Sequence, residues 1–173
     1  MVTLSLFRHA KSAWDNPGLG DFDRPLAPRG EKAAPCMGRY MAREGLEPER
    51  VLCSPAVRAR QTLELAQTEW RGSPEIRFEE NLYHTGPGEM LRALKAIPAC
   101  CAHAMLVGHN PGMHSLAVTL SGDGEGAVMD ALEMKFPTAA LVVIEFEGDW
   151  GSVVPGGGFL RHFVLPREIP EDV

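Results

Sequence analysis

Short apolar runs, each ending at polar or turn-forming residues, divide the chain into alternating strands and helices. The first run, residues 2–7, stops abruptly at the polar pair Arg8-His9, which predicts a buried strand. Similar runs predict further strands at residues 50–53, 76–78, 104–107, 139–146 and 159–165. Together these runs supply the strands of one candidate sheet.

The segment 29–44 carries the clearest helical pattern. Its apolar residues recur at helical spacing, at Ala33, Ala34, Met37, Tyr40 and Met41. Gly45 is placed to cap the C-terminal end of this helix. Pro35 must either lie in the first turn or bend the helix, because proline lacks an N–H group.

Residues 56–70 predict a second helix, with Ser54 as its N-terminal cap and Pro55 at its first position. Shorter helices are predicted at residues 89–97 and from Pro111 to about residue 120. Between these elements, glycine and proline residues indicate a loop at 12–28, a flexible turn at 122–126 and a loop at 156–158. Residues 166–173 are interpreted as a polar tail.

The alternation of strands and helices favours an α/β fold, namely a three-layer α/β/α sandwich. A chain of 173 residues with 45% hydrophobic and 23% charged residues suits one domain, which we assign to residues 1–173. No apolar stretch approaches the roughly 18 to 20 residues of a membrane span. No secretory signal is evident, so a cytoplasmic location is expected.

The formal charge of −6 and the cysteines limit the possible functions. No basic stripe offsets that charge, which argues against nucleic acid as a partner. The four cysteines, Cys36, Cys53, Cys100 and Cys101, lack the spacing of a structural zinc site and are expected to be reduced. Cys53 is expected near the candidate site, where it could be sensitive to oxidation.

Basic residues follow three of the predicted strands. Arg8 and His9 end the first strand, Arg58 follows the strand 50–53, and His109 follows the strand 104–107. In open α/β folds, ligands bind at the carboxyl ends of the strands. We therefore expect these four side chains to surround a tetrahedral oxyanion, with guanidinium forks on the phosphate oxygens and an imidazole able to attack phosphorus.

With these motifs in view, the chain resembles the histidine phosphatase superfamily, and specifically its SixA-type phosphohistidine phosphatase branch. The likeness covers most of the chain and includes the Arg-Pro-Leu…Gly stretch within residues 21–30. It implies a phosphoglycerate-mutase-like fold, in which a mostly parallel sheet contains one antiparallel strand.

The resemblance also implies roles for the motif residues. His9 would be the nucleophile that becomes transiently phosphorylated, and a backbone carbonyl would hold its other ring nitrogen. Arg8 and Arg58 would bind the non-bridging oxygens, and His109 would donate a hydrogen bond to the phosphoryl group. Ser12 and Asn110 are further candidates: Ser12 suits either phosphate contact or a capping or turn role, and Asn110 suits either substrate contact or orienting its loop.

Trp14 and the four remaining histidines lie outside these motifs. Trp14 suits either core packing or the rim of the site. The other histidines are expected in surface or hydrogen-bonded core positions; they are His84, His103, His114 and His162. No metal or other cofactor is implied, because the histidines and carboxylates are not spaced as ligands and two arginines supply the positive charge.

The sequence departs from the phosphoester-cleaving members of the superfamily, because no carboxylate clearly holds the position of their general acid. Glu80 is the tentative candidate, although an exposed carboxylate is the simpler interpretation. An alkoxide leaving group needs protonation, since water has a pKa of about 15.7. Imidazole has a conjugate acid of pKa about 6.5 and needs it far less, which favours a phosphoramidate substrate.

The leading hypothesis is a phosphatase that hydrolyses protein phosphohistidine through a covalent phosphohistidine intermediate on the enzyme, in signal transduction. Its partner would resemble a histidine phosphotransfer domain, and no membrane partner is expected. The short chain leaves little material for a lid beyond residues 12–28, which suits a site open to another protein. The alternatives are a small-molecule phosphomonoesterase, and a phosphoprotein-binding module without turnover.

Overall fold

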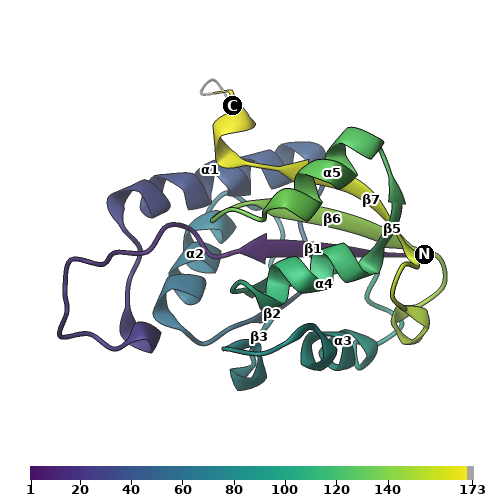
Figure 1. Ribbon diagram of the computed structural model, residues 1–173, viewed down its shortest axis with the longest axis horizontal. Coiled ribbons are helices and arrows are strands. Elements are labelled where there is room, and N and C mark those ends of the chain that lie inside the picture. The colour runs from purple at the N-terminus through teal and green to yellow at the C-terminus, as the bar shows by residue number, and fades with distance from the viewer. Residues whose placement is uncertain (171–173) are drawn as a thin grey trace.

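A seven-stranded sheet forms the middle of the molecule in the computed structural model, which describes residues 1–170 (Figure 1). The strands are β1 (Val2–Arg8), β2 (Arg50–Cys53), β3 (Glu75–Phe78), β4 (His103–Gly108), β5 (Ser121–Gly124), β6 (Leu141–Phe146) and β7 (Gly158–Val164). Their order across the sheet is β3-β2-β4-β1-β6-β7-β5. Within the described residues, only β6 runs against its neighbours, so the expected single antiparallel strand is confirmed.

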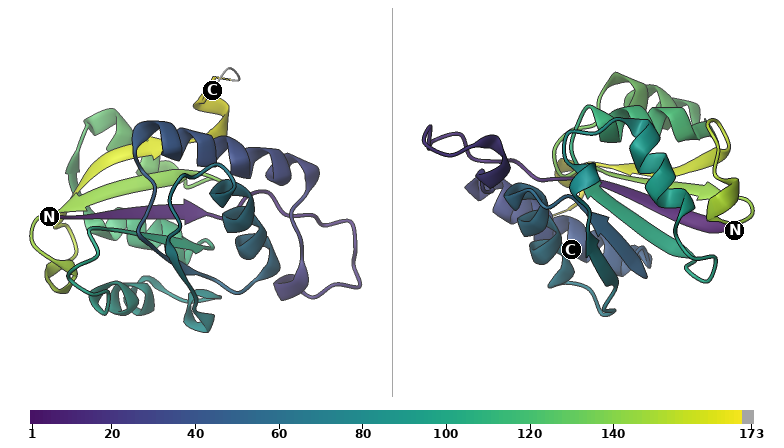
Figure 2. Two further views of the ribbon diagram at one scale, coloured as in Figure 1. Left: turned by 180° about the vertical axis from the view of Figure 1, so that it is seen from behind. Right: turned by 90° about the horizontal axis from the view of Figure 1, so that it is seen from below.

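Helices cover both faces of the sheet and complete the expected three-layer α/β/α sandwich (Figure 2). The helices are α1 (Pro28–Glu44), α2 (Val57–Gln67), α3 (Pro87–Lys95), α4 (Gly112–Leu120) and α5 (Gly126–Met134). Helices α1 and α2 lie on one face, and α3, α4 and α5 lie on the other. Four short 3₁₀ helices accompany them: η1 (Asp21–Asp23), η2 (Glu80–Leu82), η3 (Trp150–Ser152) and η4 (Pro166–Glu168).

Each face of the sheet has its own hydrophobic core. Along β1 the side chains alternate, so Leu4 and Leu6 pack in the core beneath α3, α4 and α5, while Phe7 packs in the core beneath α1 and α2. All three side chains are completely buried. Burial on both faces explains why β1 is a nearly continuous apolar run rather than an alternating one.

Most predicted elements are present with small shifts at their ends. The strand predicted at 50–53 has the same bounds as β2, and β1 is one residue longer than predicted because Arg8 still pairs with Gly108. Gly45 ends α1 with a left-handed backbone (φ 69°), as predicted. The helix begins at Pro28, so Pro35 lies in its interior and not in the first turn.

Ser54 does not cap the helix after β2, contrary to prediction. Helix α2 begins at Val57, and Ala56 is its N-cap residue, without a side-chain cap. The Ser54 hydroxyl accepts a hydrogen bond from the N–H of Ala56, the residue before the helix, and is also hydrogen-bonded to the His109 ring. A long-range contact therefore accompanies the local one.

The other secondary-structure predictions that proved wrong lie in the C-terminal third of the chain. Residues 121–124 form β5 beside β7, not a flexible turn, because pairing with a distant strand orders this glycine-rich segment. Helix α5 was not predicted at all. The predicted tail is partly ordered, since η4 forms there and Ile169 is buried against the core. Residues 171–173 of that tail lie outside the described residues.

The carboxyl ends of β1 and β4 meet at the same edge of the sheet. The two strands pair in parallel, and the His9 N–H donates to the Gly108 carbonyl at 3.1 Å. This pairing brings His9 and His109 together, although a hundred residues separate them in sequence. Within residues 1–170, every helix is too short or too polar to cross a bilayer.

Candidate active site

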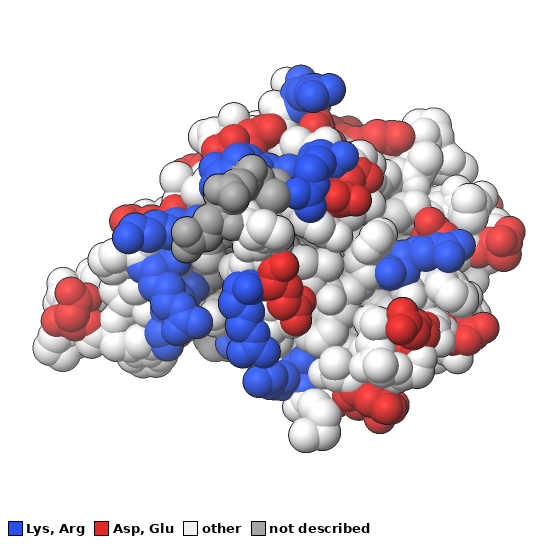
Figure 3. Space-filling view, turned by 90° about the horizontal axis from the view of Figure 1, so that it is seen from above, with Lys and Arg blue, Asp and Glu red and all other residues white. Residues whose placement is uncertain are grey.

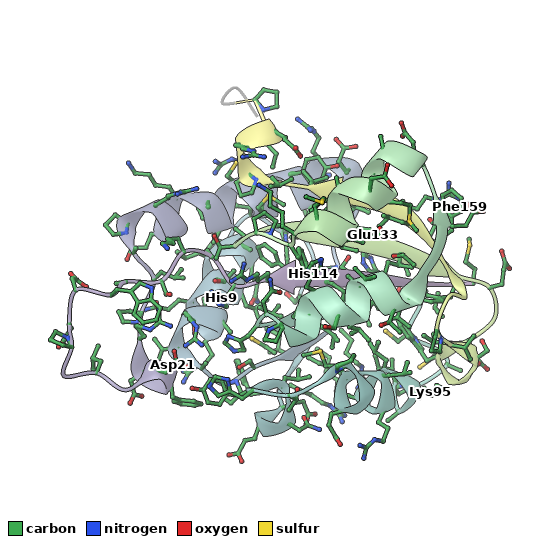
Figure 4. All side chains as sticks on the ribbon, in the orientation of Figure 1. His9, Asp21, Lys95, His114, Glu133 and Phe159 are labelled. Carbon is green, nitrogen blue, oxygen red and sulfur yellow. The ribbon has the colours of Figure 1, made fainter. Side chains whose placement is uncertain are left out.

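His9 lies directly after β1 (Figure 4). The residue is almost fully buried, with 7% of its surface exposed. Its Nδ1 is 2.7 Å from the Ala10 carbonyl oxygen. A carbonyl can only accept, so Nδ1 carries the proton and Nε2 keeps its lone pair. The expected backbone partner of this histidine is therefore confirmed as Ala10.

The pKa of His9 is lowered to about 3, chiefly by burial, with a further contribution from the positive charges of Arg58 and Arg8. The hydrogen bond to Ala10 opposes this shift but does not outweigh it. His9 is consequently a neutral imidazole at physiological pH.

Thr62 connects the His9 segment to helix α2. Its hydroxyl accepts from the Ala10 N–H at 2.9 Å and donates to the Arg58 carbonyl at 2.7 Å. The side chain is completely buried. Thr62 therefore fixes the backbone beside His9 relative to the turn of α2 that carries Arg58. The sequence analysis missed this residue, because a threonine within a helix gives no sign of such a contact.

Three arginines converge on the His9 ring. Arg8 comes from β1, Arg58 from α2, and Arg24 from the loop before α1; the loop arginine was not predicted. Each has an Nε that is buried without a hydrogen-bond partner in the described residues. Unpartnered buried donors of this kind suit a site built to bind an anion.

His109 follows β4 and faces His9, with ring centroids 5.0 Å apart. Its Nε2 is 2.7 Å from the Ser54 hydroxyl, and its buried Nδ1 has no partner within residues 1–170. Burial, the neighbouring His9 ring and Arg58 lower the pKa of His109 to about 3. His9 and His109 are thus both neutral.

A single backbone carbonyl orients two of the predicted residues. The Phe136 carbonyl accepts from Arg8 at 2.9 Å and from the Asn110 side-chain amide at 2.8 Å. The Asn110 side-chain oxygen is buried and has no partner among the described residues. Phe136 belongs to the segment after α5, so this support comes from a part of the chain whose helix was not predicted.

The loop between β1 and α1 places Asp21 against the arginines, and Figure 4 shows this residue beyond the end of β1. Its carboxylate accepts from Arg24 at 2.8 Å, from Arg58 at 3.0 Å and from the Tyr83 hydroxyl at 2.6 Å. Partial burial raises the pKa of Asp21, but these hydrogen bonds and the charge of Arg58 outweigh that effect and hold the pKa well below its usual range. Asp21 is therefore ionised.

Aromatic side chains form the rim of the pocket. The Trp14 ring stacks on the Arg24 guanidinium, 3.6 Å from the centroid, and is 71% exposed, so Trp14 lies at the rim and not in the core. His84 stacks on Tyr83, with centroids 3.9 Å apart, and lines the pocket. His84 is exposed, as expected of a surface histidine, but its place in the lining of the pocket was not predicted.

The pocket has a volume of about 310 Å³. It is lined by Arg8, His9, Lys11, Ser12, Trp14, Asp21, Arg24, Arg58, His84, His109, Asn110 and Thr138. The residues predicted to contact phosphate, Arg8, Ser12, Arg58, His109 and Asn110, all line this pocket, and the Ser12 hydroxyl accepts a hydrogen bond from Arg24. Glu80 is exposed on η2 and does not line the pocket. Cys53 is completely buried outside it, and burial raises the pKa of its thiol, which makes it a poor target for oxidation.

Comparison with known proteins agrees with this geometry. Residues 4–97 match the family model of the histidine phosphatase superfamily (branch 1). The chain is 36% identical to the uncharacterized protein Rv1276c of Mycobacterium tuberculosis, over 92% of this chain and 99% of that protein.

Solved structures give the same result. A candidate phosphohistidine phosphatase SixA from Nakamurella multipartitia superposes with a TM-score of 0.83 and 30% identity, over 95% of this chain and 96% of that one. A candidate phosphohistidine phosphatase SixA from Agrobacterium tumefaciens gives a TM-score of 0.81 and 31% identity, over 95% of this chain and 98% of that one.

Fold and pocket together define a phosphoglycerate-mutase-like α/β protein with an oxyanion pocket of arginines and histidines. The chain belongs to the histidine phosphatase superfamily, within its SixA-type branch. Its activity is accordingly that of a phosphatase acting on a phosphorylated substrate.

Proposed function

We propose that this protein hydrolyses the phosphohistidine of another protein through a covalent phospho-His9 intermediate. The observation that carries this proposal is the state of His9, a neutral imidazole whose Nε2 is unprotonated beside three arginines. The partner would be a histidine phosphotransfer domain or a protein like it.

In the first step, His9 Nε2 attacks phosphorus, and the bond between phosphorus and the substrate nitrogen breaks. The substrate ring carries a proton on its other nitrogen, so it departs as neutral imidazole with the electron pair of that bond. In the second step, water attacks phosphorus, the bond to Nε2 breaks with its electron pair returning to the His9 ring, and inorganic phosphate is released with the protons of the water. The Ala10 carbonyl supports the first step, because its hydrogen bond stabilises the positive charge that develops on the His9 ring.

The arginines stabilise the transferring group. Arg8 is held by the Phe136 carbonyl and Arg58 by the Asp21 backbone carbonyl. Guanidinium groups held in this way bind phosphoryl oxygens without reorganising during the reaction. When the Ser54 hydroxyl donates to His109 Nε2, the proton of that ring resides on Nδ1, where it can be donated to a phosphoryl oxygen.

The carboxylates favour phosphohistidine over a phosphate ester. Asp21 lies in the pocket but is ionised, so it cannot act as an acid, and Glu80 lies outside the pocket. An ester of an ordinary alcohol would lack a proton donor for its leaving oxygen. A phosphohistidine ring that is protonated on its other nitrogen leaves as neutral imidazole, whose conjugate acid has a pKa of about 6.5, so it needs no proton donor from the pocket.

Parallel assays of two substrates test the proposal. Three proteins are compared: the purified wild type, the His9→Ala variant and a His162→Ala control. Each is assayed separately with a phosphorylated histidine phosphotransfer domain and with para-nitrophenyl phosphate. His162 lies on β7 and does not line the pocket. Rapid quenching at alkaline pH traps an acid-labile phosphoenzyme. We expect phosphate release from the domain, with a label present in the wild type and the control and absent from His9→Ala.

Each contrary result points to a different function. Turnover of the aryl phosphate alone would retain the mechanism and assign a small-molecule substrate. Retention of activity in His9→Ala would refute the covalent mechanism. Binding of the phosphorylated domain without turnover or label would identify a binding module.

A further inference from the structure

A second, larger cavity adjoins the catalytic pocket. It has a volume of about 650 Å³ and lies between α1, η4 and the segment that follows α5. Lys11 and Thr138 line both this cavity and the catalytic pocket. This second cavity, which we call the basic basin, therefore lies beside the pocket that contains His9.

The charge of the basic basin is opposite to that of the protein. Its lining contains six of the 17 lysines and arginines, and no aspartate or glutamate of the described chain lines it. The six are Lys11, Arg29, Lys32, Arg39, Lys135 and Arg167. Figure 3 shows lysine and arginine side chains gathered over one part of the face that includes α1. In a chain of net charge −6, such a concentration creates a local positive field.

Helix α1 supplies one wall of the basic basin. Arg29, Lys32, Cys36 and Arg39 are spaced by three or four residues, so they lie on one face of the helix. Arg39 follows Arg29 by ten positions, which corresponds to about 15 Å along the helix axis. A row of cations of this length matches an extended segment of polypeptide better than a compact small molecule.

The six cations of the basic basin are exposed. Arg39 pairs with Glu69, whereas Lys11, Arg29, Lys32, Lys135 and Arg167 form no ion pair within residues 1–170. Several other surface arginines pair with nearby carboxylates, as Arg92 does with Glu89. These five cations are thus available to pair with an external partner.

We infer that the basic basin binds acidic side chains flanking the phosphohistidine of the protein substrate. This inference rests on the proposed function and extends it to the kind of sequence that the enzyme selects. The apolar walls, which include Ala33, Leu165 and Ile169, give the backbone of such a segment a surface to pack on. The cations then pair with glutamate or aspartate side chains on either side of the reacting residue.

Two synthetic peptides test this selectivity. Both carry one central phosphohistidine, flanked by glutamates in the first and by glutamines in the second. They are assayed with the wild type, with Arg29→Glu/Lys32→Glu, and with the control Arg92→Glu/Lys95→Glu. The control variant changes the net charge by the same amount. Its arginine and lysine also lie three residues apart on one helix, α3, but neither of them lines the basic basin.

For the wild type we expect kcat/KM to be at least tenfold higher for the acidic peptide, mainly through a lower KM. This preference should shrink as salt rises from about 50 to 300 mM, because exposed charges are screened. In Arg29→Glu/Lys32→Glu the preference should fall below twofold, while turnover of para-nitrophenyl phosphate stays unchanged. The control should retain the preference. An equal rate for both peptides in the wild type would overturn the inference, and so would an equal loss in both double variants.

A binding assay separates failure of this inference from failure of the proposed function. If para-nitrophenyl phosphate is hydrolysed but neither peptide is, the proposed function is wrong. Fluorescence anisotropy of the labelled, unphosphorylated acidic peptide then decides the role of the basic basin. Binding that is at least tenfold weaker in Arg29→Glu/Lys32→Glu than in the control supports it, and equal binding refutes it.

Discussion

The protonation state of His9 leads to a prediction that can be measured directly. The pKa of this ring is about 3 in the folded protein and about 6.5 in the unfolded chain. Between these values the unfolded state binds a proton that the folded state does not. The free energy of unfolding therefore decreases as the pH falls from 6.5 towards 3, by about 1.4 kcal/mol per pH unit.

The magnitude follows from these two pKa values. On going from pH 7 to pH 5, the His9 ring lowers the stability of the folded state by about 2 kcal/mol. His9→Gln, which does not titrate, should reduce the pH dependence of unfolding by that amount. Chemical denaturation of both proteins at pH 7 and pH 5 measures the difference.

Nuclear magnetic resonance of ¹⁵N-labelled histidine observes the same proton. At pH 5, an ordinary imidazole with a pKa of about 6.5 would be only about 3% neutral. The His9 signals, assigned by their loss in His9→Gln, should instead show a neutral ring protonated on Nδ1 down to at least pH 5. The buffer must contain no phosphate, because a bound dianion would stabilise the charged ring. Titration of His9 above pH 5 would refute the argument that burial and the arginines keep it neutral.

Three further substitutions test the pocket. Arg58→Ala should lower kcat by about 10² to 10³, as expected for loss of one preorganised donor, and a change below threefold would remove this arginine from the reaction. Thr62→Val should lower the free energy of unfolding by about 1–3 kcal/mol in denaturant titration, because the Ala10 N–H is left buried without an acceptor. Unchanged stability would show that water replaces the hydroxyl. Asp21→Asn should strengthen competitive inhibition by inorganic phosphate several-fold, since an ionised carboxylate no longer competes for Arg58; weaker inhibition would mean that Asp21 positions the arginine.

The strands and the four central site residues could be predicted from the sequence because their signals are local. The apolar run of residues 2–7 stops at Arg8 and His9, and this change from apolar to polar residues marks the end of the strand. The apolar runs that precede Arg58 and His109 mark the ends of their strands in the same way. Parallel strands present their carboxyl ends at one edge, so three such runs are enough to predict one pocket.

The tertiary structure alone decided how these residues are held. Thr62, Ser54 and the Phe136 carbonyl orient the site through contacts between segments 26 to 128 residues apart, and no local pattern reports such contacts. For the same reason β5 was mistaken for a turn, because its order depends on β7.

The distribution of charge likewise depends partly on the sequence and partly on the fold. The sequence by itself determined a net charge of −6 and an arginine-histidine chemistry suited to phosphate. It did not reveal that Asp21 lies among the arginines, nor that cations from α1, η4 and two loops line one basin. Composition is a property of the chain, whereas an electrostatic field depends on the distances that only folding sets.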